Sequence, residues 1–193
     1  ERFKKNEEIG VRMHWLYFDS ESPRLLEEAG ASYDSTMGYN EAAGYRAGTT
    51  QVYKPFETKH LLELPLHLMD TALFYPTRME LSREQAIERI RKLCENVERF
   101  GGVLTINWHD RSVLPERLWN DVYSGMLADL KSRGAWFATA AQTVAWFRRR
   151  RFASFEHDEL SGKVNRIEVN APVCSGIPNL RVRSSANLEI PIV

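Results

Sequence analysis

The strongest constraint on the fold is an alternation of helix-like and strand-like segments between residues 82 and 151. Ser82–Gln85 has the pattern of a capping box, and apolar residues follow it at a spacing of three or four, which predicts an amphipathic helix. Gly101 is expected to end this helix. The next run, Val103–Trp108, is apolar and bounded by turn and ionisable residues, which indicates a buried strand.

The second half of this alternation repeats the order. Pro115 is expected to begin another amphipathic helix, and residues 135–139 predict a short strand. Thr139 is expected to cap a last helix that ends in Arg148–Arg151. Four cations at the end of a helix favour a solvated terminus, with an anion-binding patch as the alternative. Helices and strands that alternate with short joins predict a parallel sheet covered by helices.

The N-terminal part predicts further elements of the same domain. Residues 10–18 have the composition of a strand, and a helix is expected to begin at Ser22 and to end at Gly30. Residues 31–59 are rich in loop-forming residues, and loops of this length in a compact domain are usually functional. The run 61–70 predicts another strand, which Pro65 is expected to kink or to place at an edge.

The pattern changes after Phe152. Apolar and polar residues alternate in 163–170, 180–183 and 188–190, and turn residues separate these runs. This alternation predicts a small antiparallel β appendage. We therefore expect two parts, an α/β domain over residues 1–151 and a β-rich appendage over 152–193.

The composition limits the classes of partner that the protein is expected to bind. The chain has 193 residues, enough for one substantial core, with 26 basic and 26 acidic residues. A net charge of zero provides no global positive field for nucleic acid or for an anionic membrane surface. No run approaches the roughly 20 apolar residues of a membrane span, and no signal peptide is visible, so a cytoplasmic location is predicted. Cys94 and Cys174 match no metal-binding spacing and are expected to be buried thiols.

His109 is the main catalytic candidate from the residues themselves. It follows the predicted strand Val103–Trp108, and α/β enzymes build their sites at the carboxyl ends of parallel strands. Histidine is a general acid or base near neutral pH, but it is also an ordinary residue at a strand end, and both interpretations stay open. Asp110 is a weak candidate to orient it, because adjacent strand residues point apart. His67 and Asp70 could face the cavity, but each is expected to be structural.

Several segments taken in order resemble the carboxyl-terminal half of polysaccharide deacetylases of the NodB type. They are Gly-Val-Arg-Met-His from Gly10, Tyr-Asp-Ser-Thr-Met-Gly-Tyr from Tyr33, Gly-Tyr-Arg-Ala-Gly-Thr from Gly44, Leu-Glu-Leu-Pro-Leu-His-Leu-Met-Asp from Leu62, and Gly-Gly-Val-Leu-Thr-Ile-Asn-Trp-His from Gly101. The resemblance covers about residues 9–150 and lies in the shared order of the segments rather than in any single motif.

The resemblance implies an incomplete α/β barrel and a metal-dependent carbohydrate esterase. In this family a divalent metal, commonly zinc, activates water, and a histidine protonates the leaving amine. His109 matches that general acid. Arg12 lies on the strand that carries an arginine bracing the catalytic aspartate, Asp34 and Arg46 fall in the segment that shapes the substrate groove, and Trp108 is expected to line the acyl pocket. Tyr39, with Tyr45 and Trp108, is a candidate sugar-stacking residue, although aromatic residues at this density are more often core.

Each of these residues also has a structural interpretation. Arg12 and Arg46 are also compatible with structural ion pairs, and Asp34 with a loop side chain that bonds its own backbone. The chain departs from the family because it has neither the Asp-Asp pair nor the His-x-x-x-His metal motif, so no metal site is expected within it. We expect a piece of a longer protein, whose N-terminal half, on the same polypeptide or a separate chain, binds the metal. The alternative is a degenerate homologue.

Three functions are compatible with these observations. The first is deacetylation of an acetylated polysaccharide or glycoconjugate. The second is a non-catalytic carbohydrate-binding or assembly subunit of the same fold, and the third is an amidohydrolase acting on a small C–N substrate. In each case the expected partner is a carbohydrate or a small molecule rather than nucleic acid or a membrane.

Overall fold

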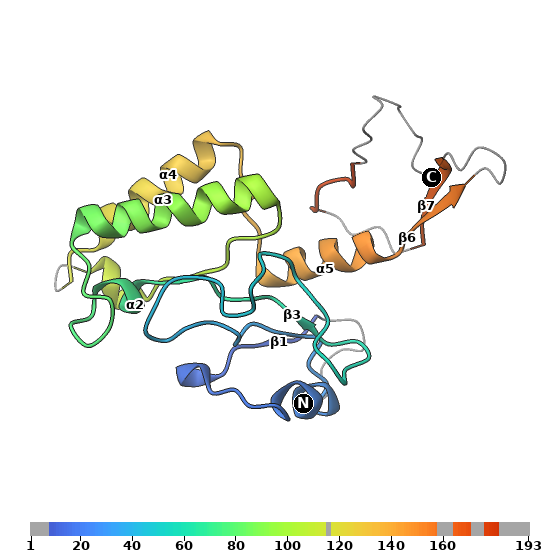
Figure 1. Cartoon of the computed structure of the whole chain (residues 1–193), viewed down its shortest axis with the longest axis horizontal. Coiled ribbons are helices and arrows are strands. Elements are labelled where there is room, and N and C mark those ends of the chain that lie inside the picture. The colour runs from blue at the N-terminus through green and yellow to red at the C-terminus, as the bar shows by residue number, and fades with distance from the viewer. Residues whose placement is uncertain (1–7, 115–116, 158–163, 171–175, 182–193) are drawn as a thin grey trace. The chain divides into compact units, whose positions relative to one another are not determined.

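The computed structural model describes residues 8–114, 117–157, 164–170 and 176–181. Its contacts divide the chain into two compact units, Glu1–Phe137 and Ala138–Val193. Figure 1 traces the chain through both. The boundary expected at residues 151 and 152 stays a prediction.

Two small parallel sheets form the framework of the first unit. One has the order β1 (Gly10–Val11), β2 (Tyr33–Asp34), β3 (Leu62–Glu63), and the other pairs β4 (Leu68–Met69) with β5 (Ile106–Asn107). Every pairing in both sheets is parallel, as the alternation of elements predicted. The described residues form no closed barrel, so the fold class is confirmed as mixed α/β and the partial barrel stays a prediction.

The strands are shorter than predicted. The strand expected over 10–18 is wrong beyond Val11, because the chain turns into a 3-10 helix, η1 (His14–Leu16), in which Trp15 has φ 61°. The run 61–70 is divided into β3 and β4 on either side of Pro65, as expected for a residue without an N–H to donate. Of the run 103–108 only Ile106 and Asn107 pair with another strand.

Two helices of this unit follow their sequence signals closely. The helix α1 (Ser22–Glu28) begins at Ser22 as predicted and ends before Gly30, whose φ is 93°. The helix α3 (Arg83–Phe100) has a complete capping box, in which the Gln85 N–H donates to Ser82 Oγ and the Ser82 N–H donates to Gln85 Oε1. It ends at Gly101, where φ is 71°.

Two other helices differ from expectation. The helix α4 (Asn120–Ser132) begins later than predicted, because Leu118 has φ 57° and a left-handed residue cannot continue a right-handed helix. Pro115, the expected first residue, lies outside the described residues. The short helix α2 (Asp70–Phe74) replaces the predicted end of the strand 61–70.

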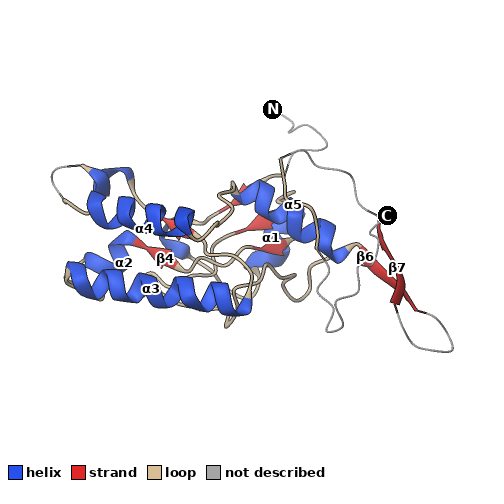
Figure 2. Cartoon of the chain, turned by 90° about the horizontal axis from the view of Figure 1, so that it is seen from above, coloured by secondary structure: helices blue, strands red, loops and turns tan. Residues whose placement is uncertain are grey.

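A hydrophobic core joins these helices to the strand β4. In Figures 1 and 2 the helices α3 and α4 run side by side. The core is made of nine buried residues from these elements and from the loop before β3: Ala43, Leu68, Leu73, Ala86, Ile90, Leu93, Cys94, Val122 and Met126. Cys94 is a buried free thiol, as predicted, and Cys174 lies outside the described residues. Each large side chain buried here contributes roughly 1.5–3 kcal/mol, which fixes the end of β4 against α3.

The second unit contains the helix α5 (Ala140–Arg151) and a two-stranded hairpin. Thr139 caps α5 through a capping box with Gln142, as predicted. The strands β6 (Ala153–His157) and β7 (Val164–Val169) are antiparallel, which confirms the pairing type expected after Phe152. The strand expected over 135–139 is wrong, since these exposed residues pair with no other described strand. Residues 182–183 and 188–190 lie outside the described residues, and 180–181 form no strand.

Candidate active site

Asp70 and His109 meet at the carboxyl ends of two paired strands. Asp70 directly follows β4, and His109 follows β5 after one residue. Because β4 and β5 are parallel, with Met69 opposite Asn107, the chain leaves both strands at the same edge of the sheet. Asp70 begins α2, and His109 precedes the 3-10 helix η2 (Asp110–Val113), so a helical turn fixes each residue directly after its strand.

Two hydrogen bonds join these residues. The backbone N–H of His109 donates to Asp70 Oδ2 at 2.9 Å, and the ring Nδ1 of His109 lies 2.6 Å from Asp70 Oδ1. Asp70 Oδ1 also accepts the backbone N–H of Thr71 at 2.7 Å. An ionised carboxylate can only accept, so the contact assigns the proton to Nδ1. The side chain of Asp70 is fully buried, whereas that of His109 is 42% exposed.

The geometry is that of an oriented proton-transfer group. With Nδ1 bonded to Asp70, Nε2 is the ring nitrogen left for a reacting group, and no other described side chain forms a hydrogen bond with it. A buried carboxylate that holds Nδ1–H fixes the orientation of an imidazole and stabilises its protonated form. The pair can therefore give or take one proton at His109 Nε2.

Sequence reasoning included His109 in the site but treated Asp70 as structural. Asp110, the partner considered from the sequence, accepts the backbone N–H of Arg111 at 2.7 Å and makes no hydrogen bond with the His109 ring. The signal for Asp70 was its position at the end of the run 61–70. In a parallel sheet that position shares an edge with His109.

Trp108 precedes His109 and packs into an aromatic cluster. Its ring stacks on Tyr123, with centroids 5.1 Å apart, and meets the edge of Phe74 at 6.2 Å. Trp108 Nε1 is buried and has no hydrogen-bond partner among the described residues, so an unsatisfied donor lies one residue from His109. The role of Trp108 in an acyl pocket stays a prediction.

Asp34 belongs to a different polar cluster, on the sheet β1–β2–β3. The register places Asp34 opposite Glu63 on the neighbouring strand. Asp34 Oδ1 accepts hydrogen bonds from Thr36 Oγ1 at 2.6 Å and from the Ser35 N–H at 2.8 Å, while Glu63 Oε1 accepts the Met37 N–H at 3.0 Å. The remaining oxygens, Asp34 Oδ2 and Glu63 Oε2, have no donor among the described residues unless one carboxyl group is protonated.

The shared proton is best placed on Glu63. Burial raises the pKa of Glu63 to about 8, and the neighbouring charge of Asp34 adds to the rise. Burial also raises the pKa of Asp34, but the hydrogen bonds from Thr36 and Ser35 oppose it. Asp34 and Glu63 are 0% and 1% exposed. The pair therefore contacts only protein, and the substrate-binding role of Asp34 stays a prediction.

Arg12 lies beside this pair, directly after β1. Its Nε donates to the Ser35 carbonyl at 3.0 Å and its second terminal nitrogen donates to Ser35 Oγ at 2.8 Å. Burial lowers the pKa of Arg12, although the charges of Asp34 and Glu63 act in the opposite direction. The guanidinium thus ties β1 to β2 and balances the carboxyl pair, and the described residues do not bring it together with His109 through a hydrogen bond.

Tyr39 and Arg46 come together in an open pocket of about 480 Å³. Arg46 donates to the Gly38 carbonyl at 3.0 Å, which holds the guanidinium at the pocket wall. The pocket lies between η1 and the loop after β2, and its lining residues are Trp15, Leu16, Tyr17, Gly38, Tyr39, Asn40, Glu41 and Arg46. Two of the residues predicted to contact substrate thus share one pocket. Trp15 and Tyr17, which sequence reasoning missed, share it with them.

Metal binding was expected from residues outside this chain. Among the described residues, no group of three or more His, Cys, Asp or Glu side chains is placed to hold a metal ion. His67 is a structural histidine, as predicted, since its Nδ1 accepts the Thr105 N–H at 3.2 Å and its Nε2 lies 3.1 Å from the Thr49 carbonyl. Burial lowers the pKa of His67 and keeps it neutral. The described residues do not by themselves fit the expected metal, which stays a prediction.

The chain was compared with protein-family models, with curated proteins and with solved structures, and none matches. Within the described residues, no helix combines the length and the apolar character needed to cross a bilayer. The resemblance to polysaccharide deacetylases and the carbohydrate partner therefore stay predictions.

Proposed function

We propose that this protein removes acetyl groups by hydrolysis from the acetylated sugars of a polysaccharide or glycoconjugate, with His109 as the proton donor. The observation that supports this proposal is the contact between Asp70 and His109, in which a buried carboxylate holds Nδ1 of an imidazole whose side chain is 42% exposed. The resemblance of the ordered segments to polysaccharide deacetylases supplies the reaction class.

The chemistry requires a proton at the leaving nitrogen. Hydrolysis of an N-acetyl group breaks the bond between the acetyl carbon and nitrogen, and the oxygen of water ends on the acetyl carbon. The nitrogen leaves as a neutral amine when it receives a proton, because an amide anion is a very poor leaving group. In this proposal His109 donates the proton from Nε2 and is reprotonated from solvent, while Asp70 keeps the Nδ1 proton in place.

The proposal includes a divalent cation, expected to be zinc, which lowers the pKa of bound water when it is present. Its ligands are proposed to lie outside the described residues, on the same polypeptide or on a separate chain. The role of the chain's own residues is to position the proton donor. Removal of metal with a chelator is expected to abolish acetate release by the native protein, and added zinc is expected to restore it.

The decisive experiment measures acetate release by the native protein from N-acetylglucosamine oligomers. His109→Ala is expected to lower kcat by about 10²–10⁴-fold, the usual contribution of a positioned acid or base. The matched control is His60→Ala, since His60 is an exposed histidine on the loop before β3. Unchanged kcat in His109→Ala, or an equal loss in both variants, contradicts the proposal.

The open aromatic pocket favours one alternative. A non-catalytic carbohydrate-binding protein of the same fold would use the surface around Trp15 and Tyr39 without turnover. Saccharide binding by the native, zinc-loaded protein with no release of acetate would support this alternative over deacetylation.

A further inference from the structure

We infer that the pocket formed by η1 and the loop after β2 is a sugar-binding subsite, in which Trp15, Tyr17 and Tyr39 contact the faces of pyranose rings. This inference rests on the proposed function and assigns to it a binding site separate from the reacting group. Trp15, Tyr17 and Tyr39 are 58%, 74% and 42% exposed, and all three line the same pocket. Exposed aromatic rings gathered in one concave site indicate a ligand with flat apolar faces.

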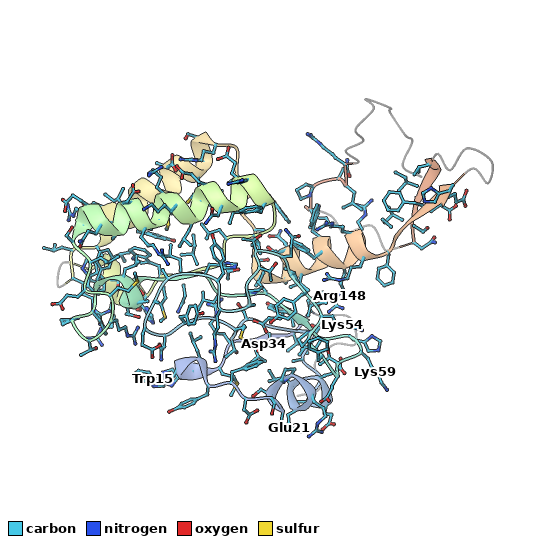
Figure 3. All side chains as sticks on the ribbon, in the orientation of Figure 1. Trp15, Glu21, Asp34, Lys54, Lys59 and Arg148 are labelled. Carbon is cyan, nitrogen blue, oxygen red and sulfur yellow. The ribbon has the colours of Figure 1, made fainter. Side chains whose placement is uncertain are left out.

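The backbone of η1 holds Trp15 in an uncommon conformation. Trp15 and Leu16 have φ values of 61° and 54°, in the left-handed region that bulky residues rarely adopt. Contacts from distant residues fix this turn, because Asn40 Nδ2 donates to the Trp15 carbonyl at 3.2 Å and the Met13 N–H donates to Thr36 Oγ1 at 3.0 Å. Figure 3 shows Trp15 at the outer side of η1. Strain that the surroundings maintain in this way is typical of binding sites.

Polar groups accompany the rings in this pocket. Arg46 and Asn40 are donors, and Glu41 is an acceptor. One Arg46 nitrogen donates to the Gly38 carbonyl, which fixes the side chain at the pocket wall. A sugar offers hydroxyl groups around its rim and C–H groups on its faces. The combination of exposed rings with both donors and acceptors matches that chemistry.

The size of the pocket argues for a saccharide rather than a protein partner. A volume of about 480 Å³ lies within the range of roughly 300–1,000 Å³ for small-ligand sites. A stable protein interface usually takes about 20–30 residues from each side, whereas this pocket is lined by eight. The open pocket suits one or two residues of a glycan that continues beyond it.

The loop that forms the pocket packs against the segment directly before β4, which leads to Asp70. A Cβ atom at Gly38 would lie 2.7 Å from Leu66 Cβ, so the loop carrying Tyr39 packs directly on that segment. The Gly44 N–H also donates to the His67 carbonyl at 2.8 Å. The loop follows the carboxyl end of β2, and His109 follows the carboxyl end of β5. The pocket loop is therefore packed against the segment that leads through β4 to Asp70.

The test is calorimetric titration of the native protein carrying His109→Ala, which prevents turnover, with the N-acetylglucosamine tetramer. Adding Trp15→Ala is expected to raise Kd by about three- to tenfold, the size of one aromatic contact. Trp15→Phe is expected to recover part of this loss. Phe56→Ala is the matched control, because Phe56 is 98% exposed and does not line the pocket, and it is expected to leave Kd unchanged.

Tyr17→Ala provides a second variant, because Tyr17 lies outside the strained turn and its replacement is not expected to affect folding. An unchanged Kd in both Trp15→Ala and Tyr17→Ala overturns the inference, as does an equal loss with Phe56→Ala. Absence of tetramer binding, or binding of an apolar decapeptide in its place, also overturns it. Acetate release that depends on His109 but not on Trp15 or Tyr17 would retain the proposed function while removing this subsite.

Discussion

Asp70 and Asp34 are both fully buried near the ends of short parallel strands, but they face different groups. Asp70 faces an imidazole that reaches solvent, whereas Asp34 faces a second buried carboxyl group on the next strand. Burial of an acidic residue therefore does not by itself mark a reactive site. Of the two carboxylates, only Asp70 forms a hydrogen bond, within the described residues, with a side chain that is exposed to solvent.

The two carboxylates also obtain their hydrogen bonds differently. Asp70 accepts from the backbone N–H groups of Thr71 and His109 and from the ring Nδ1. Asp34 accepts from Ser35 and Thr36, and the raised pKa of the neighbouring Glu63 favours a proton between the two carboxyl groups. One arrangement couples a fixed charge to an exposed ring. The other places two buried carboxyl groups side by side, which raises the pKa of Glu63.

Replacing Asp70 by Asn is expected to have the largest effect on this comparison. The amide of Asn can present its NH₂ group to Nδ1, which places the ring proton on the wrong nitrogen, and neutral replacement of such a carboxylate costs up to about 10⁴-fold in kcat. We expect acetate release by Asp70→Asn to fall at least tenfold in kcat with little change in KM. Asp110→Asn is the control, because Asp110 bonds only the Arg111 backbone among the contacts described. Full activity in Asp70→Asn would show that the carboxylate does not orient His109.

The sequence predicted elements whose signals are local. The start of α3 was predicted from the capping box at Ser82, the start of α5 from Thr139 as a cap, and the end of α3 from Gly101. The predicted strands were too long, because apolar composition does not indicate how many residues pair with a neighbouring strand. The strand after Gly10 stops where Asn40 and Thr36, distant in sequence, hold the chain in a turn.

Only the part of the candidate site that has a local sequence pattern was predicted. His109 could be predicted because it ends an apolar strand, which is a local pattern. Its contact with Asp70 depends on which strands are neighbours, and a single sequence does not state this. The carboxyl pair was missed because Glu63 lies within an apolar run and gives no sign that it faces Asp34 across the sheet.

Replacing Glu63 by Gln tests the role of the buried pair formed by Asp34 and Glu63. Burial raises the pKa of Glu63 from 4.5 to about 8, so the folded protein binds one more proton than the unfolded chain between these values. The free energy of unfolding should therefore fall as pH rises from about 4.5 to about 8, by at most about 1.4 kcal/mol per pH unit. Glu63→Gln keeps a donor toward Asp34 and should remove much of this slope.

Urea unfolding at several pH values measures the effect of Glu63→Gln. Glu57→Gln is the control, since Glu57 is exposed on the loop before β3 and should leave the slope unchanged. Acetate release at pH 7 should be nearly unchanged in Glu63→Gln if the pair acts only on stability. An unaltered slope would show that Glu63 is already ionised in the folded protein.

Replacing Glu27 is expected to have the smallest effect on stability. The pH dependence that Glu27 causes is opposite in sign to that of Glu63. Its carboxylate accepts the backbone N–H groups of Lys59, His60 and Leu61, and these bonds, that of Lys59 first, lower its pKa from 4.5 to about 2. Its contribution to stability is present above pH 4.5 and is lost as pH falls toward 2, whereas that of protonated Glu63 is lost as pH rises. Glu27→Gln should reduce only slightly the loss of unfolding free energy as pH falls from 4.5 toward 2, because solvent screens a partly exposed carboxylate. Glu28→Gln, which removes only a surface ion pair with Arg24, is the control, and an equal change in both variants would remove the special role of the backbone donors.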